Sequence, residues 1–130
     1  MWIMTSYGIL MPAALPQKIQ DQTGFDLQVR ARERAPLTKL RVALLAANLD
    51  AGRVRSTPEM DYEYRLYVHA AEFGLLIAQQ IAEIDYEKFK PTTARRGGGG
   101  DRLHTLYNRI WYVVADHYDS RILGGKGRKK

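Results

Sequence analysis

The spacing of hydrophobic positions changes several times along the chain, and each change predicts a new element. Residues 2–11 are rich in aliphatic and aromatic side chains, which predicts a first strand that Pro12 and Pro16 end. Residues 17–25 are polar and carry Gly24, so they predict a loop.

A second strand is predicted where apolar and polar positions alternate. Leu27, Val29 and Ala31 are apolar, and the positions between and after them include Arg30 and Arg32. A period of two places successive side chains on opposite faces of a strand. We therefore expect the apolar side chains to face the core and the two arginines to lie on the other face.

Hydrophobic residues then recur at the spacing of a helix. Pro36 suits the first turn of a helix, and Leu37, Leu40 and Leu44 form one apolar stripe. Residues 48–52 contain the Asn, Asp and Gly that favour a helix end. The pattern predicts a helix between Pro36 and this stop.

Two further strands are predicted in the middle of the chain. Residues 53–57 are a short candidate, and residues 62–68 show the clearest alternation. The side chains expected to face the core are Tyr62, Tyr64, Leu66 and Val68. Arg65 and Tyr67 are expected on the opposite face.

Two helices end the predicted fold. Residues 70–84 carry an apolar stripe at helical spacing, and Pro91 stops any continuation. Residues 92–100 end in four consecutive glycines and predict a flexible loop. Asp101 can cap a last helix. Trp111 lies about one position off the apolar stripe of that helix, so we expect it to border the core, with an interface anchor as the alternative.

The predicted order of elements is ββαββαα, which indicates an α+β fold. Its four strands would form one antiparallel sheet with the helices on one face, in a single domain over residues 1–123. Moving the first strand to the end of the first six elements gives the order βαββαβ. A circularly permuted ferredoxin-like sandwich is therefore one alternative, and a simple antiparallel meander is the other.

The charge of the chain is concentrated at its C-terminus. The net charge is +6, and the last ten residues contribute five positive charges and no negative one, which leaves residues 1–120 at +1. Residues 124–130 therefore predict a disordered basic tail. Its candidate contacts with nucleic-acid phosphates are Lys126, Arg128, Lys129 and Lys130.

The absence of cysteine excludes disulfides, thiolate metal sites and cysteine nucleophiles. A chain without cysteine fits the reducing environment of the cytoplasm. The apolar N-terminus has no basic segment before it and no clear cleavage site, so no signal peptide is predicted, and it is too short to span a membrane. No membrane partner is therefore expected.

Catalytic and metal-binding patterns are weak in this sequence. The three histidines share no metal-ligand spacing, so no metal, cofactor or catalytic residue is predicted. Two similar segments, residues 61–65 and 85–90, each begin Asp-Tyr-Glu. With Lys88 and Lys90 nearby, their carboxylates leave a metal-assisted nuclease as a third functional alternative. The spacing does not match the Asp…Glu-x-Lys pattern of such nucleases.

Arginine and tyrosine mark the surface on which binding is predicted. The predicted contact residues for a partner are Arg30, Arg32, Arg65, Tyr67, Lys88 and Lys90. Arginine and tyrosine are common anchors of protein interfaces. An exposed sheet face with the same side chains can also stack unpaired bases of RNA. Both a protein partner and a nucleic acid stay open at this point.

Five short segments together resemble a group of small bacterial, phage and prophage proteins without an assigned activity. The segments are Met1-Trp2 with Thr5, Val29-Arg30-Ala31-Arg32, Asp61-Tyr62-Glu63-Tyr64-Arg65, Asp85-Tyr86-Glu87-Lys88-Phe89-Lys90 and Trp111 in the last helix. The resemblance covers most of residues 1–115. It implies a phage or mobile-element setting, in which small cysteine-free α+β proteins often block a host protein such as a CRISPR or restriction effector.

The leading prediction is a non-catalytic protein that binds a macromolecular partner. Its sharpest form, which the resemblance implies, is an inhibitor of a bacterial defence complex, of anti-CRISPR or anti-restriction type. The alternative is a nucleic-acid-binding protein that uses the arginine and tyrosine side chains of the sheet together with the basic tail.

Overall fold

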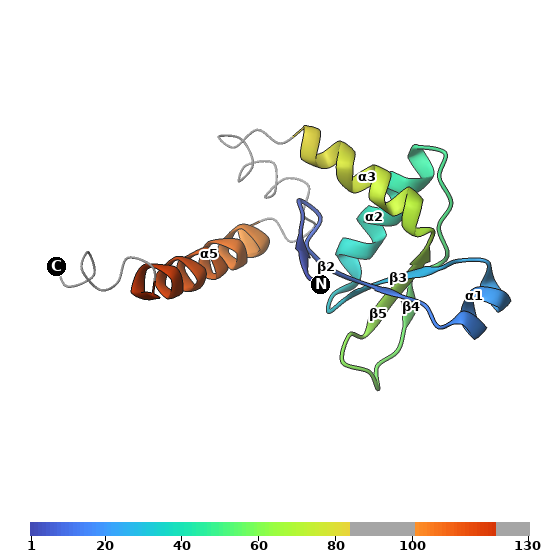
Figure 1. Ribbon diagram of the computed structural model, residues 1–130, viewed down its shortest axis with the longest axis horizontal. Coiled ribbons are helices and arrows are strands. Elements are labelled where there is room, and N and C mark those ends of the chain that lie inside the picture. Colours follow the sequence, from blue (N-terminus) through green and yellow to red (C-terminus); the bar gives the residue numbers. More distant parts are fainter. Residues whose placement is uncertain (84–100, 122–130) are drawn as a thin grey trace.

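The protein has an α+β fold, as predicted, with a five-stranded antiparallel sheet in the order β1-β2-β3-β5-β4 (Figure 1). The computed structural model describes residues 1–83 and 101–121, except for the side chains of 101, 103, 104 and 118–121. The strands are β1 (Ile3–Met4), β2 (Ile9–Ala14), β3 (Leu27–Ala31), β4 (Arg55–Ser56) and β5 (Tyr64–Val68). The helices are α1 (Gln17–Thr23), α2 (Arg34–Ala46), α3 (Ala70–Ala82) and α5 (Asp101–Arg121).

The run predicted as one strand over residues 2–11 is a hairpin of β1 and β2, which raises the number of strands from four to five. The Thr5 hydroxyl donates to the Gly8 carbonyl at 2.8 Å and accepts the N–H of Tyr7 at 3.0 Å, so it closes the turn. Gly8 has a φ of 144°, and a Cβ there would lie 2.5 Å from Cγ of Pro36. Only glycine lets this turn lie against the start of α2.

Two further predictions near the hairpin are also wrong: the end of the strand at Pro12 and the loop over residues 17–25. β2 continues through Pro12. β1 pairs with Ile9 and Leu10, so at the proline this edge of β2 has no partner strand in the described part of the chain. The expected loop over residues 17–25 contains α1, which ends at Gly24 in the left-handed region. α1 buries none of its residues, so its sequence has no apolar stripe from which a helix could be predicted.

The sheet order agrees with the circularly permuted alternative. The segment from β3 through α2 to β4 is a split βαβ unit, because β5 lies between β3 and β4. β2 occupies the other side of β3, where the permuted last strand belongs. α2 and α3 both lie on one side of the sheet (Figure 1).

The core lies between the sheet and these two helices. Its buried side chains are Leu10, Val29, Ala31, Leu37, Leu40, Leu44, Leu66, Val68, Phe73 and Leu76. Each fully buried leucine stabilises the fold by about 1.5–3 kcal/mol relative to an exposed one. β3 and β5 both contribute alternate residues to this core, so the residues between them, Arg30 and Arg65 among them, face away from it.

α5 projects from the sandwich and is attached near its N-terminal end (Figure 1). Arg102 Nη2 lies 2.8 Å from Oε1 of Glu33, and the Tyr107 hydroxyl donates to the Thr5 carbonyl. Burial raises the pKa of Tyr107 above its ordinary value. Trp111 is 61% exposed, so the expectation that it borders the core is wrong: much of α5 extends away from the sheet.

Several predictions fall on residues outside the described ranges. They are the flexible loop over residues 92–100, the tail over residues 124–130, and the segment with Lys88 and Lys90. In the described part of the chain, none of the helices combines the length and apolar character needed to cross a membrane.

Candidate functional site

Three arginines form a row across three neighbouring strands. Arg30 of β3 lies directly opposite Arg65 of β5, and Arg65 lies opposite Arg55 of β4. Neighbouring strands are about 4.8 Å apart, so the three charges share a short stretch of the sheet face that lacks α2 and α3. Like charges directly opposite one another destabilise a sheet. The row is therefore a cost to the fold unless other contacts offset it.

Tyrosine rings hold three guanidinium groups of this face. The guanidinium carbons of Arg30 and Arg32 lie 4.8 Å and 4.9 Å from the ring centre of Tyr62. The guanidinium carbon of Arg55 lies 4.5 Å from the ring centre of Tyr67. A cation–π contact at an exposed site contributes about 0.5–1 kcal/mol. These contacts offset part of the repulsion and restrict the positions of the charges.

Hydrogen bonds hold Arg65, the third member of the row, and add a second contact to Arg30. Arg65 donates through Nε to Oγ1 of Thr57 at 3.3 Å and through Nη1 to Oε1 of Gln28. Arg30 Nε donates to the Met11 carbonyl at 3.1 Å. A partner that binds these arginines meets side chains that are already ordered, which lowers the entropy cost of binding.

We call this surface the arginine face; its residues are Arg30, Arg32, Arg55, Arg65, Tyr62 and Tyr67. Among the described residues, no carboxylate lies within ion-pair distance of any of its four arginines. The carboxylate of Glu63, from the same segment of the chain, accepts a hydrogen bond from the Ser56 hydroxyl at 3.2 Å. The positive charge of the face is thus ordered but not neutralised by the described part of the chain.

The structure places Arg30, Arg32, Arg65 and Tyr67 on one side of the sheet, which is the arrangement expected from the alternation. Their role as contact residues stays a prediction. Tyr62 was expected in the core, and this is wrong, since β5 begins only at Tyr64 and the turn before it carries Tyr62 to the arginines.

Arg55 was missed as a member of this face. β4 has only two residues, too few for an alternating pattern to assign a face to Arg55. A partial signal was present, because the arginine lies in residues 53–57, which were predicted as a short strand, and that strand pairs with β5 in the structure.

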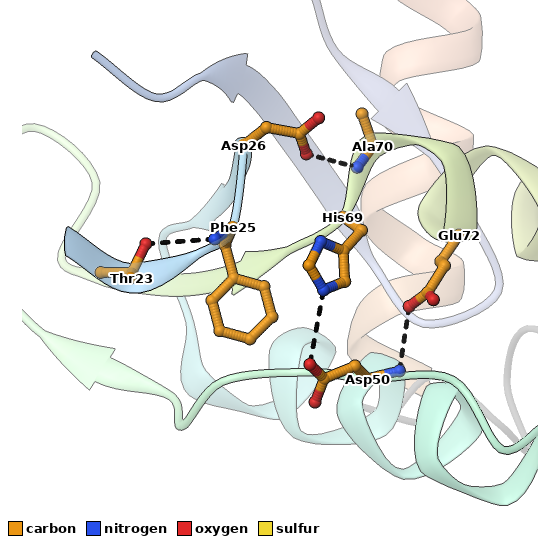
Figure 2. A network of polar contacts seen from close by, with 7 residues as sticks. All are labelled: Thr23, Phe25, Asp26, Asp50, His69, Ala70 and Glu72. Atoms are coloured by element: carbon orange, nitrogen blue, oxygen red, sulfur yellow. Dashed lines mark hydrogen bonds and ion pairs between the residues drawn. The ribbon is translucent and has the colours of Figure 1, made fainter. Parts of the chain in front are cut away.

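A second polar cluster gathers at the start of α3, and we call it the His69 cluster (Figure 2). Its residues are Phe25, Asp26, Asp50, His69 and Glu72. Oδ1 of Asp26 accepts the N–H of Ala70 at 2.8 Å, and Oε1 of Glu72 accepts the N–H of Asp50 at 2.9 Å. His69 Nε2 lies 3.4 Å from Oδ2 of Asp50, and the centre of the His69 ring lies 4.7 Å from that of the Phe25 ring, with the two planes tilted by 38°.

The His69 cluster joins three parts of the chain rather than forming a reactive centre. Asp26 supplies an acceptor to the first turn of α3, whose N–H groups have no partner within the helix. Glu72 and His69 connect that helix to the segment after α2. The carboxylates of Asp26, Asp50 and Glu72 each contact a group of the same chain. The contacts of His69 with Asp50 and Phe25 therefore have a structural role.

The described residues contain no group of three or more His, Asp or Glu side chains placed to hold a metal ion. Of the two Asp-Tyr-Glu segments, only the first is described, and the convergence of their carboxylates is therefore untested. The nuclease alternative stays a prediction.

Comparisons with family models, with curated proteins and with solved structures found no match to this chain. The resemblance to small phage and bacterial proteins thus stays a prediction, and the arginine face is assigned from its geometry alone.

Proposed function

We propose that this protein is a non-catalytic binding protein whose arginine face docks on an acidic surface of a protein partner. One observation carries the proposal: four arginines are ordered on one sheet face by tyrosine rings and hydrogen bonds, without a carboxylate from the described part of the chain. A matching acidic surface would relieve the repulsion between them and form charge-assisted hydrogen bonds.

A protein partner is favoured over a nucleic acid for two reasons. Residues 1–120 carry a net charge of only +1, so the body as a whole attracts a polyanion weakly. Guanidinium groups already lie over Tyr62 and Tyr67, which reduces the ring surface available for stacking bases. Arginine and tyrosine together are frequent anchors of protein interfaces.

The sharper form of the proposal is that the partner is a bacterial defence effector in the cytoplasm. This form depends on the phage or mobile-element setting that the sequence resemblance implies, and not on the geometry of the face. An ordered cationic surface is suited to cover an effector surface, because a blocking protein needs contact area and charge complementarity but no catalytic group.

The test is affinity capture from a nuclease-treated bacterial lysate followed by mass spectrometry. The variant Arg30→Glu/Arg32→Glu reverses two charges of the arginine face. Its matched control, Lys18→Glu/Lys39→Glu, makes the same change in net charge at exposed positions on α1 and α2. We expect the same partner with wild type and control, and its loss with the arginine variant. If the arginine variant still captures the same partner at moderate salt, the arginine face is not the surface that binds it.

A nucleic acid is the second candidate, and the net charge of the last ten residues favours it. Fluorescence anisotropy with labelled single-stranded DNA and RNA should be measured at several salt concentrations, with and without residues 124–130. If the tail binds phosphates, its deletion makes the dependence of affinity on salt less steep. The absence of affinity at low salt in both chains would eliminate this candidate.

A further inference from the structure

A cavity of about 660 Å³ lies at the end of the sheet where β2 begins and β3 ends. The β1–β2 hairpin, the first turn of α2 and the first half of α5 enclose it. Sites for small ligands commonly have volumes of about 300–1,000 Å³ and are mostly apolar with a few placed polar groups. The size of this cavity therefore suits a small organic molecule.

The walls of the cavity combine apolar surface with positive charge. Apolar lining comes from Trp2, Ile9, Met11, Pro36 and Leu106. Arg102, Leu106 and Arg109 follow one another at intervals of four and three residues, so they share one side of α5. Arg32 contributes a third positive charge from the end of β3.

The described residues that line the cavity carry more positive than negative charge. Glu33 is the one carboxylate among the described lining residues, and Arg102 holds it at 2.8 Å. Three arginines and one glutamate leave the wall at +2. Arg109 has no carboxylate within ion-pair distance among the described residues. A ligand with a negative group would supply the missing charge.

The hairpin, α2 and α5, which enclose the cavity, are held together by hydrogen bonds or close packing. The Thr5 hydroxyl closes the hairpin turn, and Gly8 lies against Pro36 with no room for a side chain. The Tyr107 hydroxyl donates to the Thr5 carbonyl and ties α5 to the turn. The arrangement is thus present before any ligand binds, which lowers the cost of binding.

From this arrangement we infer that the cavity binds a small amphipathic organic anion, with an apolar or aromatic body and one carboxylate or phosphate group. The body packs on the apolar lining near Trp2 and Leu106, and the anionic group meets Arg109 and Arg32. Arginine binds both anions through paired N–H donors. This site shares Arg32 with the arginine face, but its other lining residues lie outside that face, and the inference does not depend on the proposed function.

The test uses 4-phenylbutyrate and its uncharged amide as probes. In a Trp111→Phe chain, Trp2 is the only tryptophan, so its fluorescence reports on the cavity alone. We expect a saturable change with the carboxylate and an affinity at least tenfold weaker for the amide. In that background, Arg109→Gln removes one charge and Thr105→Phe fills the cavity from an exposed position of α5, and each should weaken binding at least fivefold. The control Arg53→Gln removes an exposed arginine that does not line the cavity and should leave binding unchanged.

Three results would overturn the inference: no saturable change with the carboxylate, equal affinity for the amide, or the same loss of affinity in Arg53→Gln as in Arg109→Gln. Thermal melting of each variant confirms that it is folded under the conditions of the titration. Loss of partner capture in Arg30→Glu/Arg32→Glu and loss of probe binding in Arg109→Gln are distinguishable outcomes, because Arg109 lines the cavity and does not belong to the arginine face.

Discussion

The His69 cluster and the arginine face both gather polar side chains around the same sheet, but they satisfy them differently. In the His69 cluster, carboxylates meet backbone N–H groups and an imidazole of the same chain, at 2.8–3.4 Å. In the arginine face, four positive side chains meet aromatic rings and neutral oxygens. The first cluster balances opposite partial charges, and the second holds charges of one sign together.

This difference separates a structural cluster from a candidate interface. A cluster whose groups satisfy one another stabilises the connection between the elements that carry them. A cluster with like charges directly opposite across strands costs stability, and ordering contacts reduce that cost without removing it. This unmatched charge is the observation on which the proposed docking of a partner depends. The two clusters should therefore respond differently to substitution.

Removal of Asp26 from the His69 cluster is expected to have the largest effect on stability. In Asp26→Ala the N–H of Ala70 loses its acceptor, and no other side chain of the described residues caps α3. Loss of a helix cap costs about 1 kcal/mol, which corresponds to a fall in Tm on the order of 4 °C. Thermal unfolding followed by circular dichroism measures it.

The control for Asp26 is Asp21→Ala, which removes a carboxylate that, among the described residues, accepts from the exposed side chain of Gln17 alone, at 2.9 Å. Its expected cost is a few tenths of a kcal/mol. Equal losses in the two variants would contradict the structural role of the His69 cluster.

Tyr107 provides a further contact that the chain satisfies internally, with a smaller expected effect. In Tyr107→Phe the Thr5 carbonyl loses a donor, at a cost of about 1 kcal/mol or less. Burial raises the pKa of Tyr107 above its ordinary value of 10.0. A raised pKa means that this stabilisation is complete below pH 10 and is lost as the pH rises above it. Denaturant unfolding at about pH 8 and about pH 11 measures both effects.

Lysines also titrate in that range, so the comparison is between wild type and Tyr107→Phe rather than between the two pH values. We expect wild type to lose more stability than the variant between them. Equal losses would mean that the Tyr107 hydroxyl is ionised as easily in the folded chain as in the unfolded one.

Much of the arginine face was predictable because alternation in a strand depends on sequence alone. Val29 and Ala31 are apolar and face the core, which fixes the direction of Arg30 on the same strand. The same argument applied to Leu66 and Val68 fixes that of Arg65. The register that brings the two arginines opposite each other depends on contacts between distant segments, and no local pattern specifies it.

The remainder of the site depends on features with no local signal. Tyr62 lies two residues before the start of β5 at Tyr64. Because it is outside the strand, the alternation of β5 does not place it, and its ring lies at the arginines rather than in the core. Trp111 lies beside the apolar stripe of its helix, but a helix that leaves the sandwich has no core to face. Periodicity identifies the apolar side of a helix; it does not identify where the supporting sheet ends.

Arg55 tests the arginine face itself, with the smallest expected effect on stability. Arg55→Thr removes a charge opposite Arg65, which stabilises the sheet, and loses the contact with Tyr67, which costs about the same. We expect a net change of no more than about 0.5 kcal/mol. Thermal unfolding at low and high salt separates the two contributions, because salt screens repulsion between exposed charges.

Wild type should therefore gain a few tenths of a kcal/mol between about 0.01 M and about 1 M salt, where the screening length falls from about 30 Å to about 3 Å. The gain should be smaller in Arg55→Thr, whereas Arg53→Thr, which removes a neighbouring exposed arginine that is not in the row, should behave as wild type. If Arg55→Thr and wild type gain equally, the row is not under repulsion. The unmatched charge would then no longer distinguish the arginine face from the His69 cluster, and the reason to look there for a partner would be lost.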